Sequence, residues 1–427
     1  MKELLVLLHG ELVGVLQQST QGNRTFQYSV DADPVNEVSV ALPYRADPYP
    51  KRKTDPFIEG LLPEGEGVRQ ALAQAFDISP ANPFALLEHI GLECAGAVQF
   101  VRPSELDMAL AETGDLIPCT ERDIGRRLRS LASDPKGSWI VDKERWSLAG
   151  AQSKFALRWA DGWHEAIGAE PTTHILKPGI NDFRDQALNE HLSLKTLGKA
   201  GLPVAQSEYV EFDDSPAIVV ERYDRLIDNG RVIRIHQEDL CQATSTLPRY
   251  KYESAKGPSA LKIVRTLRES GAPETEVHRF AEGLIGNYLL GAPDAHAKNY
   301  SIILAPGLVA LAPFYDIASG LPYEYLEDGI PSKKDGLRKS AMAIGGERRF
   351  GRVARKHWTK FAADSGIDED WIVGTVRALA LLIPDALDEV LREEAEAASG
   401  SLLPERLRGP IRNLCGSTLT LLDRNYP

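Results

Sequence analysis

Hydrophobic residues change their spacing about halfway along the chain. In the first half they lie mostly in short alternating or continuous runs, such as 155–159 and 217–220. Runs of this length are typical of β-strands. In the second half they recur three and four residues apart, as in the stripe from Val277 to Tyr288, which is typical of an amphipathic helix. The pattern predicts an α+β protein with a strand-rich first half and a helical second half.

Local signals predict where the elements lie. The run 3–17 alternates and turns at His9-Gly10, which predicts a hairpin. Further strands are expected at 25–30, 37–41, 97–101, 173–176, 207–212 and 231–235. Helices are expected within 57–90 and at 122–131, 185–200, 236–242, 259–267, 277–288, 353–363, 368–382, 384–398 and 410–422. Pro103 follows a strand-like run, so we place a first domain boundary there and treat 1–103 as one segment.

Composition narrows the class of protein. A chain of 427 residues can form two or three domains, and 43% hydrophobic with 26% charged residues is ordinary for a soluble protein. The formal charge of −12 argues against a surface built as a whole to attract nucleic acid. The four cysteines form no C-x-x-C pair, and we find no apolar run long enough for a signal peptide or a membrane span. We therefore expect a cytoplasmic protein without a membrane contact.

The stretch from Asp294 to Asp316 carries the strongest chemical signal. Asn299 follows Asp294 after four residues and opens an apolar run, 300–304. A loop at 305–307 and a second apolar run, 308–314, return the chain to Asp316. A hairpin of this kind would bring Asp316 close to Asn299. Protein kinases use the same order of a catalytic Asp, an Asn, a hairpin and a metal-binding Asp, so the pattern predicts a phosphotransferase.

Each residue of this motif has a predicted role and a purely structural alternative. Asp294 would orient a substrate hydroxyl, and Asn299 with Asp316 would hold Mg²⁺ through oxygen ligands. Lys298 would lie near the transferred phosphoryl group, and His296 would support the loop. Alternatively, Asp294 could cap a turn, Asn299 could be an Asx-turn residue and His296 could be a satisfied structural histidine.

Three earlier features fit a nucleotide site but are weak when taken alone. The small-residue loop 145–154 could approach phosphate with its N–H groups, or be an ordinary hairpin turn. Lys177 closes a strand, and Glu190 lies near the start of the next helix. The two could form an ion pair, as the corresponding residues do in kinases. Alternatively, Lys177 could be a solvated strand end, and Glu190 an acid that the dipole of the helix favours in its first turn. The segment 221–223 could be a hinge that reads adenine, or a charged strand exit.

Together these stretches resemble the HipA-like serine/threonine kinases, toxins of bacterial toxin–antitoxin systems. The matching segments run in order over nearly the whole chain, and the last hundred residues are the least diagnostic. They are Ser147-Leu-Ala-Gly-Ala-Gln-Ser-Lys154, Thr172-Thr-His-Ile-Leu-Lys177, Val220-Glu-Arg-Tyr-Asp-Arg225, Gln237-Glu-Asp-Leu-Cys-Gln242, Lys251-Tyr-Glu-Ser254, Gly291-Ala-Pro-Asp-Ala-His-Ala-Lys-Asn299 and Pro313-Phe-Tyr-Asp-Ile317.

The resemblance implies a two-lobed, protein-kinase-like fold that uses ATP and Mg²⁺. Its parts would be an N-terminal subdomain (1–103), the rest of a strand-rich N-lobe with the phosphate loop and hinge (104–224), and a helical C-lobe (225–427). Asp294 would be catalytic, and Asn299 and Asp316 would bind the metal. Nucleotide contacts would come from Ala149, Gly150, Ala151, Gln152, Ser153, Lys154, Lys177, Glu221, Arg222, Tyr223, His296, Lys298, Asn299 and Asp316.

The resemblance also implies regulation and partners. Ser147 matches a serine that family members autophosphorylate, which pulls the loop out of the nucleotide site and switches the kinase off. Family substrates are aminoacyl-tRNA synthetases, notably the glutamyl enzyme, whose loss inhibits translation. A HipB-like helix-turn-helix antitoxin would bind this acidic chain and supply most contacts to operator DNA.

Two other classes of function stay open at this stage. A small-molecule phosphotransferase would share the arrangement of Asp, Asn and Asp residues, but it would not need the N-terminal hundred residues in this form. A non-catalytic corepressor would use a kinase-like body only to hold an antitoxin on DNA. The sequence departs from ordinary protein kinases in having Gly291-Ala-Pro293 before Asp294 and Ile317-Ala318 after Asp316, as the HipA-like pattern does.

Overall fold

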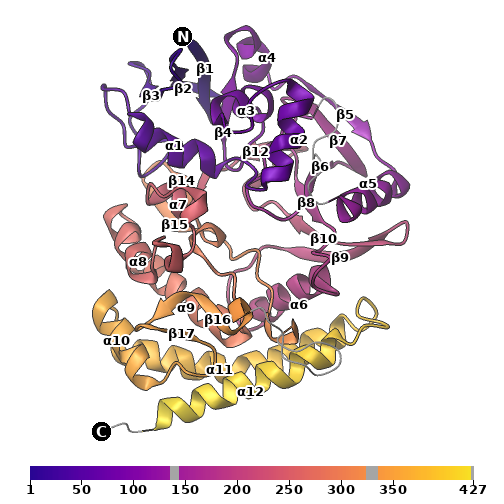
Figure 1. The fold of residues 1–427 in the computed structure, drawn as a ribbon, viewed down its shortest axis with the longest axis vertical. Coiled ribbons are helices and arrows are strands. Elements are labelled where there is room, and N and C mark those ends of the chain that lie inside the picture. Colours follow the sequence, from indigo (N-terminus) through magenta and orange to yellow (C-terminus); the bar gives the residue numbers. More distant parts are fainter. Residues whose placement is uncertain (135–143, 324–334, 425–427) are drawn as a thin grey trace. The chain divides into compact units, whose positions relative to one another are not determined.

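The structure is a computed structural model that describes residues 1–134, 144–323 and 335–424 (Figure 1). The chain forms two compact units, each assembled from separate stretches of sequence. The first unit contains 1–180, 210–249 and 302–309, and the second contains 181–209, 250–301 and 310–427. Strands dominate the first unit and helices the second, so the predicted α+β organisation is confirmed.

The first unit begins with a four-stranded sheet in the order β3-β2-β1-β4. Its strands are β1 (Lys2–Leu8), β2 (Glu11–Gln18), β3 (Arg24–Tyr28) and β4 (Val98–Val101). The predicted hairpin is present, because β1 and β2 pair antiparallel around the left-handed residues His9 and Gly10. Three helices follow β3 in the chain: α1 (Lys51–Gly60), α2 (Glu66–Phe76) and α3 (Pro83–Ile90).

The strand predicted at 37–41 is wrong. The backbone N–H of Val38 donates to the hydroxyl of Tyr28, and that of Val40 donates to the carboxyl group of Glu238. These N–H groups therefore bond to side chains of distant residues instead of a neighbouring strand. The apolar spacing that suggested a strand comes from Val38 and Leu42, which are buried in the core.

A six-stranded sheet has the order β5-β7-β6-β8-β10-β9. Its strands are β5 (Gly114–Pro118), β6 (Phe155–Trp159), β7 (Trp163–Gly168), β8 (His174–Lys177), β9 (Ser207–Phe212) and β10 (Ser215–Glu221). Helix α5 (Glu121–Ser133) packs against β10. One hydrophobic core contains residues of both sheets, among them Leu8, Phe57, Trp146 and Phe155. The N-terminal segment is therefore built into the same core as β6 and β8.

Short elements complete the strand-rich part. A ribbon of β11 (Arg225–Asp228) and β12 (Arg231–Arg234) precedes β13 (Gln237–Asp239) and α7 (Leu240–Ala243). The helix predicted from His236 is thus wrong in its first turn, because Gln237–Asp239 pairs with β14 (Ser301–Ala305) as a strand. Asp239 then caps the short helix by accepting hydrogen bonds from the N–H groups of Cys241 and Gln242.

The second unit is built of helices α6 (Gln186–Lys199), α8 (Ala260–Glu269), α9 (Glu274–Leu290), α10 (Arg355–Ser365), α11 (Glu369–Glu393) and α12 (Leu403–Asp423). It also holds the small hairpin of β16 (Lys339–Ile344) and β17 (Glu347–Arg349). Figure 1 shows α11 and α12 side by side, and α11 also packs on α6 and α9. Among the helices in the described ranges, none combines the length and the apolar character that crossing a membrane requires.

The two helices predicted at 368–382 and 384–398 form one helix, α11, with Pro384 inside it. A proline here removes one backbone donor and usually kinks or ends a helix. Buried residues continue on both sides of it, including Ile383 and Leu387. Burial of this continuous apolar face against α6, α9, α10 and α12 compensates for the missing hydrogen bond.

Candidate active site

A helix end positions the loop that begins with Asp294. Helix α9 ends at Gly291, which has a left-handed backbone with φ of +64°. A β-carbon at this position would approach the Leu321 side chain to 2.5 Å, so glycine is needed for space as well as for conformation. The N–H of Ala292 donates back to the carbonyl of Asn287, which fixes the direction in which the chain leaves the helix.

Asp294 presents its carboxylate to solvent, with 58% of the side chain exposed. The hydroxyl of Tyr252 donates to Asp294 Oδ1 at 2.5 Å, and His296 Nε2 lies 3.7 Å from the same oxygen. The Asn299 side-chain amide and the His296 N–H both donate to the Asp294 backbone carbonyl at 2.8 Å. The backbone of the aspartate is therefore fixed by two hydrogen bonds, while more than half of its side chain stays accessible to solvent.

His296 forms the buried wall beside this carboxylate. Its side chain is 3% exposed, and its ring meets the Tyr252 ring edge-on with the centroids 4.8 Å apart. Burial, and then the nearby cation of Lys251, lower the pKa of His296 to about 3. The imidazole is therefore neutral near pH 7, which agrees with the supporting role predicted for it.

The hairpin returns the chain from Asn299 to Asp316 as the sequence predicts. It consists of β14 and β15 (Leu308–Leu311), and the N–H of Ala312 donates to the carbonyl of Ser301. The hydroxyl of Tyr315 donates to the carbonyl of Lys298 at 2.8 Å and bonds Ser301 Oγ at 2.6 Å. These contacts tie the residue before Asp316 to the residue before Asn299.

Asp316 and Asn299 provide donors that suit a hard divalent cation. Because the Asn299 NH₂ group donates to a backbone carbonyl, its side-chain oxygen is the atom left to act as a ligand. Asp316 adds a half-buried carboxylate on a left-handed backbone with φ of +57°, a conformation uncommon outside glycine. Two oxygen ligands from the protein fit Mg²⁺, which keeps its remaining positions for phosphate and water.

Tyr252 lies in a segment that matches the family, 251–254, but sequence analysis assigned it no role in the site. It precedes Asp294 by 42 residues, so no local spacing links them. The neighbouring Glu253 accepts a hydrogen bond from the N–H of Ala343 in β16, which anchors the segment that carries Tyr252. Only the three-dimensional contact with Asp294 identifies this tyrosine.

The predicted phosphate loop lies in the first unit, and a hydrogen bond joins Ala149 to Lys154 within it. Lys154 Nζ donates to the carbonyl of Ala149 at 2.5 Å, across the left-handed residue Gly150. The carbonyl of Gly150 accepts from the N–H of Glu64, so the segment before α2 supports the loop from one side. Ala151 is exposed, Gln152 is half-buried and Ser153 is buried. The lysine thus lies against the backbone of the loop, and contact of this loop with phosphate stays a prediction.

Ser147, at the start of this loop, is fully buried. Its hydroxyl donates to the carbonyl of Leu61 at 2.7 Å, and its N–H donates to the carbonyl of Glu93. Phosphate transfer to this hydroxyl would require the serine to leave its present position.

Lys177 and the predicted hinge lie on neighbouring strands. Lys177 ends β8 as a buried side chain, and it pairs in register with Ile218 of β10. Strand β10 ends at Glu221, whose side chain is exposed, and the Tyr223 hydroxyl donates to Gln237. The Arg222 side chain points into a buried ion network. Its N–H donates to the Thr173 carbonyl and its carbonyl accepts from the Arg225 N–H, so its contact with a nucleotide stays a prediction. Glu190 belongs to the second unit, and its pairing with Lys177 stays a prediction.

Comparisons with known proteins agree with this arrangement. Residues 4–101 match the model of the HipA N-terminal domain, and residues 146–387 match the model of the HipA-like C-terminal domain. The chain is 35% identical to "Putative kinase Y4mE" of Sinorhizobium fredii, and the match covers 91% of each protein. It is 30% identical to "Serine/threonine-protein kinase toxin HipA" of Shewanella oneidensis, over 78% of this chain and 76% of that protein.

A solved structure supports the fold over the full length. The chain superposes with a TM-score of 0.79 and 25% identity on a chain in the Shewanella oneidensis structure of HipA, HipB and operator DNA, and covers 98% of each chain. The kinase-like α+β fold expected from the sequence is thereby confirmed.

Proposed function

This chain belongs to the HipA family, and we propose that it is an ATP-dependent kinase that phosphorylates serine or threonine on a protein. The observation that carries this proposal is the catalytic loop, in which an exposed Asp294 is held by Tyr252 and Asn299 beside a neutral His296. Kinase names among the relatives support it at the level of the family.

The protein groups would divide the work of transfer. Asp294 would orient the substrate hydroxyl and take its proton, while Tyr252 fixes one of the two carboxylate oxygens. Asn299 and Asp316 would hold Mg²⁺, which when bound neutralises charge on the phosphates. Lys298, Lys154 and Lys177 would add positive charge near the phosphoryl groups. The backbone at 221–223 would read adenine.

We extend the proposal to regulation at Ser147 and to partners. Ser147 is buried in the present conformation, so its autophosphorylation would trap the loop in a displaced, inactive form. The related structure contains HipB and operator DNA, which supports a HipB-like antitoxin as partner here. Because this chain carries a net charge of −12, that partner would supply most of the phosphate contacts. The protein substrate we expect is an aminoacyl-tRNA synthetase such as the glutamyl enzyme.

Incubation with labelled ATP and Mg²⁺ tests the proposal, with wild type compared with Asp294→Ala and Ser147→Ala. Label on the wild type that is lost in both variants would support kinase chemistry with Ser147 as its own acceptor. Label kept on Ser147→Ala would move the acceptor elsewhere. Folded wild-type protein that neither takes label nor turns over ATP would overturn the catalytic proposal in favour of a corepressor.

A further inference from the structure

Glu93 lies in the connection between α3 and β4, and sequence analysis assigned it no role. Its backbone forms a parallel bridge with Trp146: the Glu93 N–H donates to the Arg145 carbonyl, and the Glu93 carbonyl accepts from Ser147. Ser147 begins the predicted phosphate loop. The backbone of Glu93 therefore connects the N-terminal segment to the start of that loop by hydrogen bonds.

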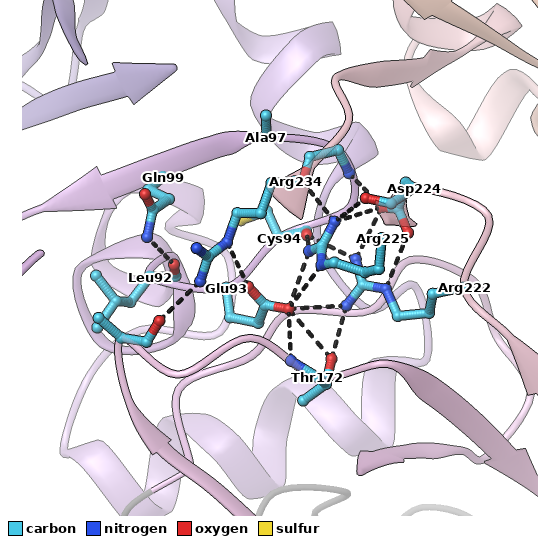
Figure 2. A network of polar contacts seen from close by, with 12 residues as sticks. Leu92, Glu93, Cys94, Ala97, Gln99, Thr172, Arg222, Asp224, Arg225 and Arg234 are labelled. Carbon is cyan, nitrogen blue, oxygen red and sulfur yellow. Dashed lines mark hydrogen bonds and ion pairs between the residues drawn. The ribbon is translucent and has the colours of Figure 1, made fainter. Parts of the chain in front are cut away.

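The Glu93 carboxylate reaches the other two nucleotide-binding elements (Figure 2). Its Oε1 accepts from the N–H and the hydroxyl of Thr172, each at 3.1 Å, and from Arg222 Nη1 at 3.1 Å. Thr172 lies two residues before β8, the strand that ends in Lys177. Arg222 is the middle residue of the predicted hinge. The Thr172 hydroxyl also accepts from Arg222 Nη1 at 2.8 Å, so hydrogen bonds join the three residues in a closed triangle.

The charges of this network are balanced only when Glu93 is ionised. Arg225 Nη2 and Arg234 Nε also donate to it, at 2.9 and 3.0 Å. Asp224 pairs with Arg222 and Arg225, and Glu112 pairs with Arg234. Although burial opposes ionisation, the three guanidinium groups lower the pKa of Glu93 to about 2. Arg222, Arg225 and Arg234 thus meet the buried Glu93 and Asp224, while the partly exposed Glu112 at the edge also pairs with Arg231. A neutral side chain at position 93 would leave buried positive charge without compensation.

We infer that Glu93 is a positioning residue for the nucleotide, which locks the phosphate loop, the Lys177 strand and the hinge into one arrangement. The inference rests on the proposed use of ATP. A site that binds with backbone N–H groups depends on their placement within about 0.5 Å. Glu93 contacts a residue of the phosphate loop segment, a residue just before the Lys177 strand and a residue of the hinge. It also gives the N-terminal segment a direct part in binding nucleotide.

Thr172 offers the cleaner test, because it can be changed without altering any charge. Thr172→Ser keeps the hydroxyl group that bonds Glu93 and Arg222, whereas Thr172→Val keeps the shape of the side chain and removes that hydroxyl group. We would measure binding of ADP with Mg²⁺ to the full chain by calorimetry, since ADP donates no phosphoryl group to Ser147. We expect ADP to bind Thr172→Val about 3- to 10-fold more weakly than wild type, and Thr172→Ser within about twofold of it.

Glu93→Gln tests the acid itself, and Asp55→Asn is its matched control. Asp55 forms a largely buried bidentate pair with Arg24 in the same N-terminal segment, and neither residue belongs to the network around Glu93. We expect about tenfold or greater weakening for Glu93→Gln and a change within about twofold for Asp55→Asn. Should Glu93→Gln fail to fold, the Thr172 pair still decides.

The outcomes separate the inference from the function on which it rests. If wild type binds ADP and folded Thr172→Val binds it equally well, Glu93 and its triangle are structural only. Equal weakening in Asp55→Asn and Thr172→Val would likewise overturn the inference, because any loss of stability would then have the same effect. A wild-type protein that binds neither ADP nor ATP would overturn the proposed function and the inference together.

Discussion

The network around Glu93 and the loop around Asp294 each hold a carboxylate in place, but they differ in exposure and in charge. Glu93 is 2% exposed and is surrounded by guanidinium groups, whereas the Asp294 side chain is 58% exposed beside an uncharged tyrosine and a neutral histidine. A buried, fully paired acid can only hold structure together. An exposed acid that is oriented by neutral groups can still accept a proton. The comparison separates the acid that we propose positions the nucleotide from the acid that we propose takes the proton.

The largest effect should follow from neutralising the reactive acid. Asp294→Asn keeps the size of the side chain but removes its capacity to take a proton, so phosphoryl transfer should fall by about 10²- to 10⁴-fold. Unfolding in urea should change little, because the carboxylate is exposed. Initial rates of label transfer from ATP, measured with the denaturation midpoint, test both statements. A variant that transfers label at the wild-type rate would remove Asp294 from the catalytic role.

The opposite result is expected for the positioning acid. Glu93→Gln should lower the free energy of unfolding by about 3 kcal/mol or more, because three buried guanidinium groups would lose a shared anion. Asp55→Asn, which breaks a single ion pair, should cost less. Urea unfolding followed by tryptophan fluorescence measures the difference. Equal stability of Glu93→Gln and wild type would show that the buried charges are compensated in some other way.

Sequence spacing predicts the catalytic loop but cannot predict the Glu93 network. Asp294, Asn299 and Asp316 lie within 23 residues and are joined by one hairpin, so their order alone indicates their geometry. The network joins Glu93 with Thr172, 79 residues away, and with Arg234, 141 residues away. Long-range pairing of this kind leaves no local pattern in the chain.

The errors in the predicted fold have the same cause. Residues 37–41 have a strand-like spacing, but their N–H groups bond to Tyr28 and Glu238. Pro384 has the sequence signal of a helix end, but packing on both sides of it continues α11. Strands β6, β8 and β10 were predicted well because each contains a short apolar run that is buried at least in part. Local sequence preference determines the secondary structure of these strands, whereas tertiary contacts determine it at 37–41 and around Pro384.

A smaller effect is expected at the tyrosine that orients the reactive acid. Tyr252→Phe removes the hydrogen bond to Asp294 Oδ1 and keeps the ring against His296. We expect kcat to fall by about tenfold, with KM for ATP unchanged, because the variant loses one charge-assisted hydrogen bond to Asp294 and keeps the packing against His296. Steady-state rates at several ATP concentrations give both constants. A change in KM alone would assign Tyr252 to nucleotide binding and not to the orientation of Asp294.

The smallest effect concerns a second buried acid, Glu238, which sharpens the contrast with Glu93. Burial, with Asp239 and Glu37 nearby, raises the pKa of Glu238 to about 8, against the hydrogen bonds from Ser39 and Val40. The folded protein therefore keeps a proton on Glu238 between pH 4.5 and 8 that the unfolded chain releases, so this group makes the free energy of unfolding fall as pH rises through that range. The buried histidines act at lower pH. The pKa values of His236 and His296 are depressed, so their contribution to the free energy of unfolding is lost as pH falls below about 6.5.

Because Glu238 holds a proton in the folded protein, Glu238→Gln should be at least as stable as wild type at pH 8. Its free energy of unfolding should also decline less from pH 6.5 to 8. Urea unfolding at both pH values measures that decline, and an identical decline in the two proteins would mean that Glu238 ionises in the folded protein as it does in the unfolded chain.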